Sequence, residues 1–305
     1  MKKIKDPGFG YLSRKGAKSI INKRGGSNVL HKNKAFSIND IYSYIIQISW
    51  FKFFLLVFLS YIVVNSFFAI IYLLIGIEEI TSPTGNLLDD FFNAFFFSAQ
   101  TITTVGYGGI SPQGFLGNLI SSFQALVGLL SFSFITGLLY GRFSKPKAAV
   151  RFSENIILRK FNNGKAIMFK LMNSRPNIMI DPEVTVIFSL TDNKHSKGFK
   201  RNFYKLNLEL DKLKYLTTTW TVVHEIDEES PFYNMSNNQI KMLDAEWYVL
   251  IQYHDETFAQ NVHQLHSYQM ENLLVDVKFS SSVHFNDQGF TVLDHHILSE
   301  VENLV

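Results

Sequence analysis

Thr104-Val105-Gly106-Tyr107-Gly108 lies between two long apolar segments of this 305-residue chain. An aromatic run at residues 91–97 precedes it, and the second apolar segment begins at residue 114. Polar backbone of this kind is tolerated at membrane depth only where protein buries it or where it lines a watery cavity. The two glycines allow conformations that would crowd a side chain, so successive carbonyl groups can turn toward one axis. We therefore expect a re-entrant loop that presents backbone oxygens.

Residues 104–108 match a known pattern, the carbonyl-lined filter that replaces the hydration shell of a potassium ion. The Thr104 hydroxyl would add one more ring of oxygens at the inner end. One chain supplies only one arc of each ring, so this interpretation requires a homotetramer. K⁺ is the transported ion and the only metal expected, bound by Thr104, Val105, Gly106, Tyr107 and Gly108. The alternative is a glycine-rich re-entrant turn that conducts nothing.

The distribution of basic residues indicates a topology. There is no Lys or Arg from Phe53 to Gly141, whereas residues 1–40 contain ten. The positive-inside rule then places both termini in the cytoplasm. We expect a multi-pass protein with two spans in the cell membrane. The net charge of +3 is too small to suggest nucleic acid as a partner, and the absence of cysteine excludes disulfides and thiolate metal sites.

Hydropathy divides the chain into four parts. Residues 51–75 are almost entirely apolar and can cross a hydrocarbon core of ~30 Å, whereas residues 91–103 are too short to do so. The predicted parts are a basic flexible cytoplasmic tail at 1–35, an interfacial helix at 36–50, a transmembrane pore domain at 51–146 and a cytoplasmic β-sandwich regulatory domain at 147–305. The predicted elements of the pore domain are an outer helix at 51–76, a pore helix at 89–103, the filter at 104–108 and an inner helix at 114–143.

The second span carries an aromatic face. Phe132, Thr136 and Tyr140 are four residues apart and so share one side of a helix. If that side lines a pore, rings of the two aromatic side chains would form hydrophobic constrictions that gate by dewetting. The alternative is that these aromatics pack against a neighbouring helix or against lipid. Gly137 is a candidate bending point.

A basic cluster follows the second span. Arg142, Lys145 and Lys147 lie on both sides of Pro146, which ends the helix. Basic residues just cytoplasmic of a span commonly meet anionic headgroups, so lipid is a candidate partner. The topology alone would also place positive charge here.

Residues 150–300 lack the long apolar segments of the pore domain and show a pattern typical of β-strands. Short stretches rich in β-branched and aromatic residues, such as 184–188 and 247–253, are separated by polar turns such as 162–164. This spacing is typical of an all-β sandwich. The sequence has no glycine-rich βαβ fingerprint, which argues against a nucleotide-binding gating ring. Its histidines form no convergent ligand set and no nucleophile motif stands out, so we predict no enzyme, no catalytic residues and no cofactor.

Several separate motifs resemble those of one family. In chain order they are Asp40 to Trp50, Phe95-Phe96-Phe97-Ser98-Ala99-Gln100-Thr101, Thr136-Gly137 through Arg142-Phe143-Ser144-Lys145-Pro146, Asn173-Ser174-Arg175, His224-Glu225-Ile226-Asp227 with Ser230-Pro231, and Asp255-Glu256-Thr257-Phe258. Together they resemble the inward-rectifier potassium channels, most closely the prokaryotic members, over about residues 37–292. The resemblance implies a two-helix pore with a re-entrant pore helix and filter, and a C-terminal immunoglobulin-like sandwich. It also implies voltage-independent gating at the inner-helix bundle, coupled to the cytoplasmic domain, and, through the prokaryotic members, a location in a bacterial inner membrane.

The resemblance implies roles for residues of the pore. Tyr140 matches the bundle-crossing gate position. Phe132 stands where strongly rectifying relatives carry an acid that binds polyamines or Mg²⁺, so its neutral ring argues against strong polyamine block. Gln100 stands where many relatives have a Glu that supports the filter. Ba²⁺, Mg²⁺ and polyamines are the candidate blockers.

The resemblance also implies regulatory positions. Four basic residues match or neighbour positions where phosphoinositides or other anionic lipids act: Arg142, Lys145, Lys147 and Arg175. A cytoplasmic constriction loop would comprise Glu256, Thr257, Phe258, Ala259 and Gln260.

Two further classes of protein are alternatives to this interpretation. One is a potassium channel gated by calcium through a soluble ring, against which the missing βαβ pattern argues. The other is a membrane-tethered β-sandwich receptor, or a channel homologue that does not conduct, and ion flux separates it from a channel. A voltage sensor is disfavoured because the sequence has two spans and no helix with repeated arginines.

Overall fold

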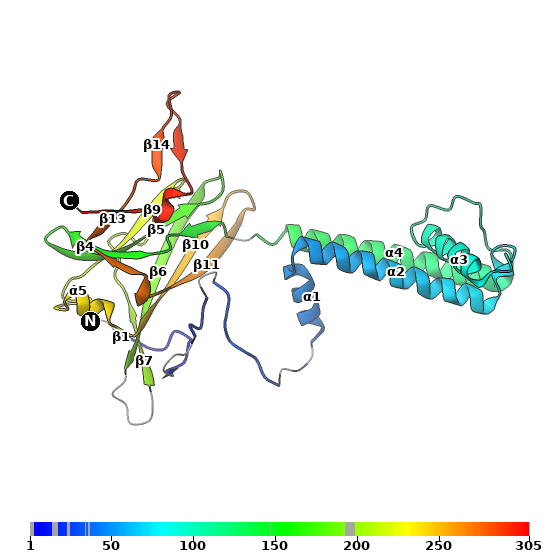
Figure 1. Cartoon of the computed structure of the whole chain (residues 1–305), viewed down its shortest axis with the longest axis horizontal. Helices are drawn as coiled ribbons and strands as arrows, with labels where there is room; N and C mark the ends of the chain where they lie inside the picture. Colours follow the sequence, from blue (N-terminus) through cyan, green and yellow to red (C-terminus); the bar gives the residue numbers. More distant parts are fainter. Residues whose placement is uncertain are drawn as a thin grey trace. The chain divides into compact units, whose positions relative to one another are not determined.

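The chain forms two compact units in a computed structural model that describes residues 3–13, 18–22, 25–33, 35, 37–146, 148–192 and 199–304. The helical unit comprises Asn33–Lys145, and the β unit comprises Met1–Lys32 together with Pro146–Val305. Figure 1 labels the elements of both units. Each unit has its own core, and each is described by itself.

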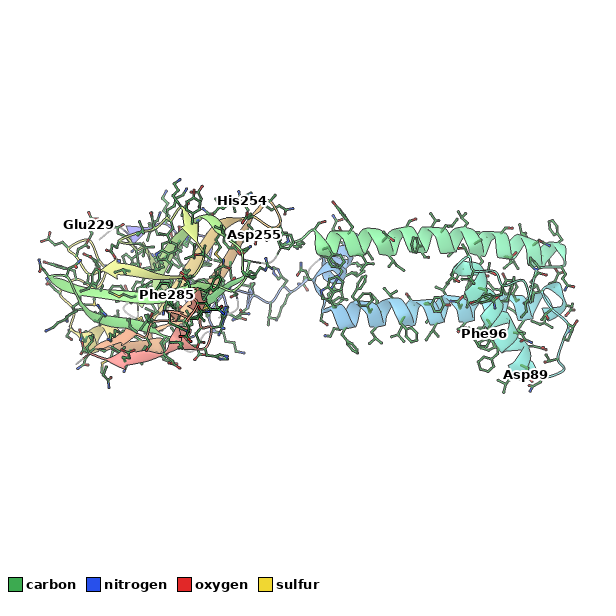
Figure 2. All side chains as sticks on the ribbon, turned by 90° about the horizontal axis from the view of Figure 1, so that it is seen from above. Asp89, Phe96, Glu229, His254, Asp255 and Phe285 are labelled. Carbon is green, nitrogen blue, oxygen red and sulfur yellow. The ribbon has the colours of Figure 1, made fainter. Side chains whose placement is uncertain are left out.

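The helical unit contains one short and three longer helices with a 3₁₀ turn between them. They are α1 (Ile38–Gln47), α2 (Trp50–Ile75), η1 (Ile77–Glu79), α3 (Leu87–Ile102) and α4 (Phe115–Phe143). The helices α2 and α4 have 26 and 29 residues and are apolar enough to cross a membrane. They lie side by side, and α3 packs against both of them at one end (Figures 1 and 2). Figure 2 also shows side chains projecting along both long helices. In the most apolar stretch of each helix, only 17% of the stretch is buried within the chain.

Local capping sets the ends of these helices. The Asn86 side chain accepts a hydrogen bond from the Leu88 amide at 3.1 Å, so α3 begins two residues before the predicted residue 89. Gly76 has a φ of 105°, which ends α2 at Ile75 where the prediction continued to residue 76. The extended residue Ile48 ends α1 at Gln47, inside the predicted range of 36–50.

An apolar cluster joins α2 and α3. Phe68, Ala69 and Tyr72 of α2 are buried against Ala94 and Phe97 of α3. The rings of Tyr72 and Phe97 meet edge to face with their centroids 5.1 Å apart. This packing fixes α3 as a short helix lying on the two spans, which is what a re-entrant helix requires.

The β unit is a sandwich of two sheets. One sheet has the order β1-β7-β6-β10-β11, with β2 on β7 and β8 on β6, and the other has the order β12-β4-β5-β3, with β9 on β5. Apart from β12 with β4, neighbouring strands in these sheets run antiparallel. The strands of the two sheets are β1 (Lys3–Ile4), β2 (Leu12–Ser13), β3 (Val150–Phe152), β4 (Ile156–Phe161), β5 (Gly164–Asn173), β6 (Met179–Asp192), β7 (Phe199–Lys205), β8 (Tyr215–Leu216), β9 (Thr219–Glu225), β10 (Ala245–Asp255), β11 (Gln260–Gln269) and β12 (Leu273–Val275).

Smaller elements complete the β unit. They are the helix α5 (Asn237–Lys241), the 3₁₀ turns η2 (Met270–Asn272) and η3 (Ile297–Ser299), and the paired strands β13 (Val277–Phe279) with β16 (Val301–Asn303) and β14 (Val283–Phe285) with β15 (Thr291–Leu293). Both sheets contribute to the main core of this unit. Phe169 of β5, Phe188 of β6 and Trp247 of β10 belong to that core, and all three side chains are almost completely buried. The prediction of a C-terminal β-sandwich is therefore confirmed.

The N-terminal stretch differs from the flexible tail expected at 1–35. Residues Lys3–Ile4 and Leu12–Ser13 pair with β7, and the Phe9 ring packs on Tyr248 with centroids 4.4 Å apart. The Asp6 carboxylate accepts hydrogen bonds from the amides of Gly8, Phe9 and Gly10. These short strands cover β7, which would otherwise expose unpaired backbone groups at a sheet edge.

Candidate functional site

The backbone of the predicted filter alternates between left-handed residues and residues that are not left-handed. Thr104, Gly106 and Gly108 have φ values of 59°, 54° and 83°, while Val105 and Tyr107 between them are not left-handed. In a regular strand neighbouring residues face opposite sides, and changing the sign of φ at every second residue brings successive carbonyls to one side. The left-handed conformation costs a non-glycine residue such as Thr104 of order 1–3 kcal/mol. This arrangement is suited to coordinating a dehydrated cation.

The glycines of this stretch are required for their conformation. A Cβ atom added to Gly106 or Gly108 would meet no atom of this chain within 4 Å. Gly109 also has open space around it, but its φ lies outside the left-handed region. A side chain at residue 106 or 108 is therefore disfavoured by the backbone, whereas residue 109 tolerates one.

The last turn of α3 anchors the filter. The carbonyl oxygen of Gln100 accepts hydrogen bonds from the amides of Val105 at 2.9 Å and Gly106 at 3.4 Å. The Thr104 amide donates to the carbonyl of Thr101 at 3.1 Å. Gln100 was expected to support the filter, and in this chain the contacts run through its backbone carbonyl. Any movement of this turn would be passed directly to residues 104–106.

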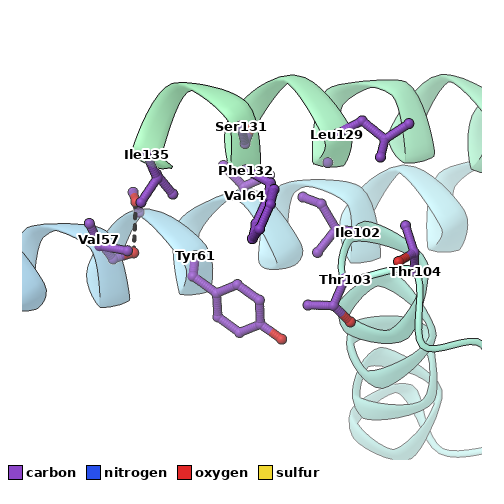
Figure 3. Close-up of a pocket in the computed structure, with 12 residues that line it drawn as sticks. Val57, Tyr61, Val64, Ile102, Thr103, Thr104, Leu129, Ser131, Phe132 and Ile135 are labelled. Atoms are coloured by element: carbon purple, nitrogen blue, oxygen red, sulfur yellow. Dashed lines mark hydrogen bonds between the residues drawn. The ribbon is translucent and has the colours of Figure 1, made fainter. Parts of the chain in front are cut away.

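A cavity of about 510 Å³ lies beneath the end of α3 (Figure 3). Thr103, which follows α3, and Thr104 of the filter line it, together with Tyr61 of α2 and Phe132 of α4. Two predicted site residues that are 28 positions apart, Thr104 and Phe132, are thus brought to one cavity. Thr136 and Tyr140, the other two residues of the predicted pore face, are not among the residues that line this cavity.

The predicted pore face of α4 is uncovered within the chain. Phe132 and Tyr140 are each 74% exposed, and Thr136 between them is also exposed. The Thr136 hydroxyl donates to the carbonyl of Phe132 at 2.9 Å, which satisfies it inside its own helix. Gly137 continues the helix without a close neighbour. Phe132 lines the same cavity as Tyr61 of α2 while most of its ring stays exposed, and the roles of these aromatics in gating stay predictions.

The guanidinium group of Arg142 is bound within the protein, whereas a lipid site would leave it open to a headgroup. Its guanidinium donates hydrogen bonds to the backbone carbonyls of Ile45, Ile46 at 3.1 Å and Ile48 at 2.7 Å. It also stacks over the ring of Trp50, 4.5 Å from the centroid. Arg142 thus holds the end of α1 to the end of α4. It does so with the guanidinium N–H groups that would otherwise bind an anionic headgroup.

The other lipid candidates have different settings. Lys145 is exposed, and Lys147 lies outside the described residues. Arg175, in the β unit, forms an ion pair with Asp255 at 3.2 Å, and the Asp255 side chain is fully buried. The charge of Arg175 is therefore partly balanced within the protein, while the ammonium group of Lys145 faces outward.

The expected constriction loop is the tight turn between β10 and β11. Figure 2 labels Asp255, at the end of β10, and its carboxylate accepts hydrogen bonds from the amides of Thr257 at 3.0 Å and Phe258 at 3.4 Å. The guanidinium of Arg175 lies over the Phe258 ring, 5.3 Å from its centroid. Ala259 has a φ of 48°, and Gln260 begins β11. Glu256 to Ala259 are thus held as a short hairpin turn.

A set of buried polar side chains in the helical unit is not among the site residues predicted from the sequence. Asn65, Ser98 and Gln124 are fully buried, on α2, α3 and α4 respectively, and each makes a hydrogen bond to another helix of this set. Polar residues inside a span are costly and therefore point to a role, and this was the signal available in the sequence. Among the described residues no group of three or more metal-ligating side chains gathers to hold a metal ion.

Comparisons with known proteins agree with this geometry. Residues 57–145 match a family model described as "Ion channel", and residues 150–304 match one described as "Inward rectifier potassium channel C-terminal domain". The chain is 33% identical to the inward rectifier potassium channel Kirbac3.1 of Paramagnetospirillum magnetotacticum over 257 residues, which is 84% of this chain and 86% of that protein. It is 24% identical to the G protein-activated inward rectifier potassium channel 4 of Mus musculus over 308 residues, covering 93% of this chain and 72% of that protein. The G protein-activated inward rectifier potassium channel 3 of Homo sapiens is 24% identical over 304 residues, covering 92% and 77%. This chain belongs to the inward rectifier potassium channel family.

Proposed function

We propose that this potassium-selective inward-rectifier channel conducts K⁺ along the backbone oxygens of residues 104–108, contributed by four copies of the chain. The observation that carries the assignment is the alternating backbone of the filter, with left-handed residues at 104, 106 and 108. Val105 and Tyr107 are 53% and 82% exposed in the single chain, and neighbouring copies would cover these apolar side chains. The two spans cross the membrane, and both termini lie in the cytoplasm, as the basic residues before the first span favour.

The test is uptake of ⁸⁶Rb⁺ into liposomes that contain the purified protein, with Na⁺ as competitor and Ba²⁺ as blocker. The wild type should take up Rb⁺ in preference to Na⁺, and Ba²⁺ should stop the uptake. Gly106→Ala should abolish selective uptake, because an L-residue at this φ is strained by of order 1–3 kcal/mol in every subunit.

Gly109→Ala is the matched control for this substitution. It adds the same methyl group in equally open space, but at a backbone conformation that L-residues adopt readily. It should keep wild-type uptake and block. Equal uptake by the Gly106→Ala and wild-type proteins would refute the filter assignment.

The lipid part of the proposal assigns anionic headgroups to Lys145. Its ammonium group is exposed at the end of the second span, whereas Arg142 is engaged with the carbonyls of α1. An exposed charge beside an anionic leaflet contributes about 1 kcal/mol of attraction. We expect Lys145→Gln to change the fraction of anionic lipid needed for half-maximal Rb⁺ uptake by several-fold.

Lys241→Gln is the control for lipid dependence, since Lys241 is an exposed lysine on α5 of the β unit. It should leave the lipid dependence unchanged. If Lys145→Gln and Lys241→Gln both behave like the wild type over the whole lipid series, Lys145 has no part in lipid regulation.

A further inference from the structure

A chain of hydrogen bonds crosses the helical unit behind the filter. The Tyr72 hydroxyl donates to Gln124 Oε1 at 2.7 Å, and Gln124 Nε2 donates to both the carbonyl and the hydroxyl of Ser98, at 3.0 and 2.6 Å. The Ser98 hydroxyl donates to Asn65 Oδ1 at 2.7 Å, and Asn65 Nδ2 donates to the carbonyl of Tyr61 at 2.8 Å. We call Asn65, Tyr72, Ser98 and Gln124 the polar network. It links α2, α3 and α4.

The hydrogen bonds of the polar network can have only one order of donors and acceptors. The backbone carbonyl of Ser98 only accepts, so the amide nitrogen of Gln124 must face it and the amide oxygen must face Tyr72. The Ser98 hydroxyl then receives a hydrogen bond from Gln124 and gives its single proton to Asn65. Every member is paired, and each of the four side chains is buried with no exposed surface. A fully paired network of this kind specifies one arrangement of the helices that carry it.

The network holds the same turn of α3 that anchors the filter. Ser98 lies two residues before Gln100, whose carbonyl accepts the amides of Val105 and Gly106. One helical turn beyond Gln124, Gly128 allows α4 to approach the backbone at the other end of this turn, since a Cβ atom there would collide with the Ile102 carbonyl. The helix α4 therefore meets the turn from Ser98 to Ile102 at both ends, by a hydrogen bond and by close backbone contact.

We infer that the polar network positions the selectivity filter: it fixes the last turn of α3 against α2 and α4, and thereby fixes the carbonyls of residues 104–106. This inference rests on the proposed function, in which those carbonyls line the ion path. Asn65, Tyr72, Ser98 and Gln124 are positioning residues, since they act on the ion through the backbone of α3. Selectivity depends on where the filter oxygens lie, so loss of the network should alter ion preference and block in addition to helix packing.

The test measures properties of the filter in the full-length protein in liposomes. Ser98→Ala removes the hydrogen bond from α3 to Asn65 of α2 and one of the two bonds from Gln124, whereas Gln124→Leu removes both bonds from α4 to α3. Each should lower the preference for Rb⁺ over Na⁺ and shift the half-blocking Ba²⁺ concentration by about tenfold, the scale of one lost buried hydrogen bond. The double variant should shift both properties further than either single variant but by less than the sum of the two, because both substitutions remove the bond between Gln124 and the Ser98 hydroxyl and each also removes bonds that the other leaves intact.

Ser121→Ala is the matched control for Ser98→Ala. Ser121 is also a buried serine in the helical unit, but its hydroxyl donates to the carbonyl of Asn118 within its own helix at 3.1 Å. It should keep the wild-type ion preference and barium block. If Gln124→Leu does not assemble, Tyr72→Phe removes a single hydroxyl at the end of the network and should produce a smaller shift in the same direction.

Two outcomes separate this inference from the proposed function. If Gly106→Ala abolishes selective uptake while Ser98→Ala and Gln124→Leu change only protein yield or thermal stability, the network merely packs the helices and the inference is wrong. If the wild type shows no selective uptake, or Gly106→Ala leaves it intact, the proposed function itself fails.

Discussion

The guanidinium group of Arg142 lies against the last turn of α1, where backbone carbonyls have no partner in their own helix. A planar fork can donate to several of these carbonyls at once and can stack on Trp50 at the same time. An ammonium group carries the same charge and three donors, but it lacks the planar fork that reaches several carbonyls in fixed directions and stacks flat on the indole ring. The role of this residue therefore depends on the shape of the side chain as well as on its charge.

At the scale of single residues, Arg142→Lys separates these two properties. If Arg142 acts by holding α1, the lysine variant should release it, and backbone amides of residues 38–47 should exchange with deuterium about tenfold faster, the scale of one lost charge-assisted hydrogen bond. The measurement is hydrogen–deuterium exchange of the protein in lipid nanodiscs. The reverse swap at an exposed position, Lys145→Arg, serves as control and should leave the exchange of α1 as it is in the wild type. Unchanged exchange in Arg142→Lys would show that charge alone suffices.

At the scale of the elements, hydropathy predicts the helical unit well. Long apolar segments identify α2 and α4, and the short aromatic segment before the filter identifies α3 as too short to span. The ends are less accurate because they depend on single caps, such as the Asn86 side chain at the start of α3. The role of Gly106 and Gly108 in the filter could also be predicted from the sequence, because glycine adopts left-handed conformations without strain.

Other features of the elements depend on partners distant in the sequence. The strands β1 and β2 are two residues each and lack an alternating apolar pattern, so only their pairing with β7 reveals them. Gln124 alone in an apolar helix fits contact with a water-filled pore as well as contact with another helix. Its burial against Ser98 becomes evident only when α3 and α4 are placed together.

At the scale of the whole molecule, the single chain leaves much apolar surface uncovered. The spans are largely unburied, and on one face of α4 Phe132 and Tyr140 are each 74% exposed. A homotetramer with α4 innermost would gather four copies of this face around one axis. Four tyrosine rings at one level would exclude water from the pore, and a dewetted constriction stops ions without a charged barrier.

Tyr140→Ala tests this constriction. Removing four rings should raise Rb⁺ uptake several-fold in liposomes in which the wild-type channel is mostly closed. The preference for Rb⁺ over Na⁺ should stay at the wild-type value, because the amides of residues 104–106 are held by the carbonyls of Gln100 and Thr101 at the end of α3. Phe134→Ala is the matched control, since Phe134 is also an exposed aromatic of α4 but points to a different side of the helix. If both substitutions change uptake equally, loss of an aromatic side chain has loosened the helix in general. If neither changes it, the pore is closed elsewhere, and the prediction that Tyr140 forms the gate is wrong.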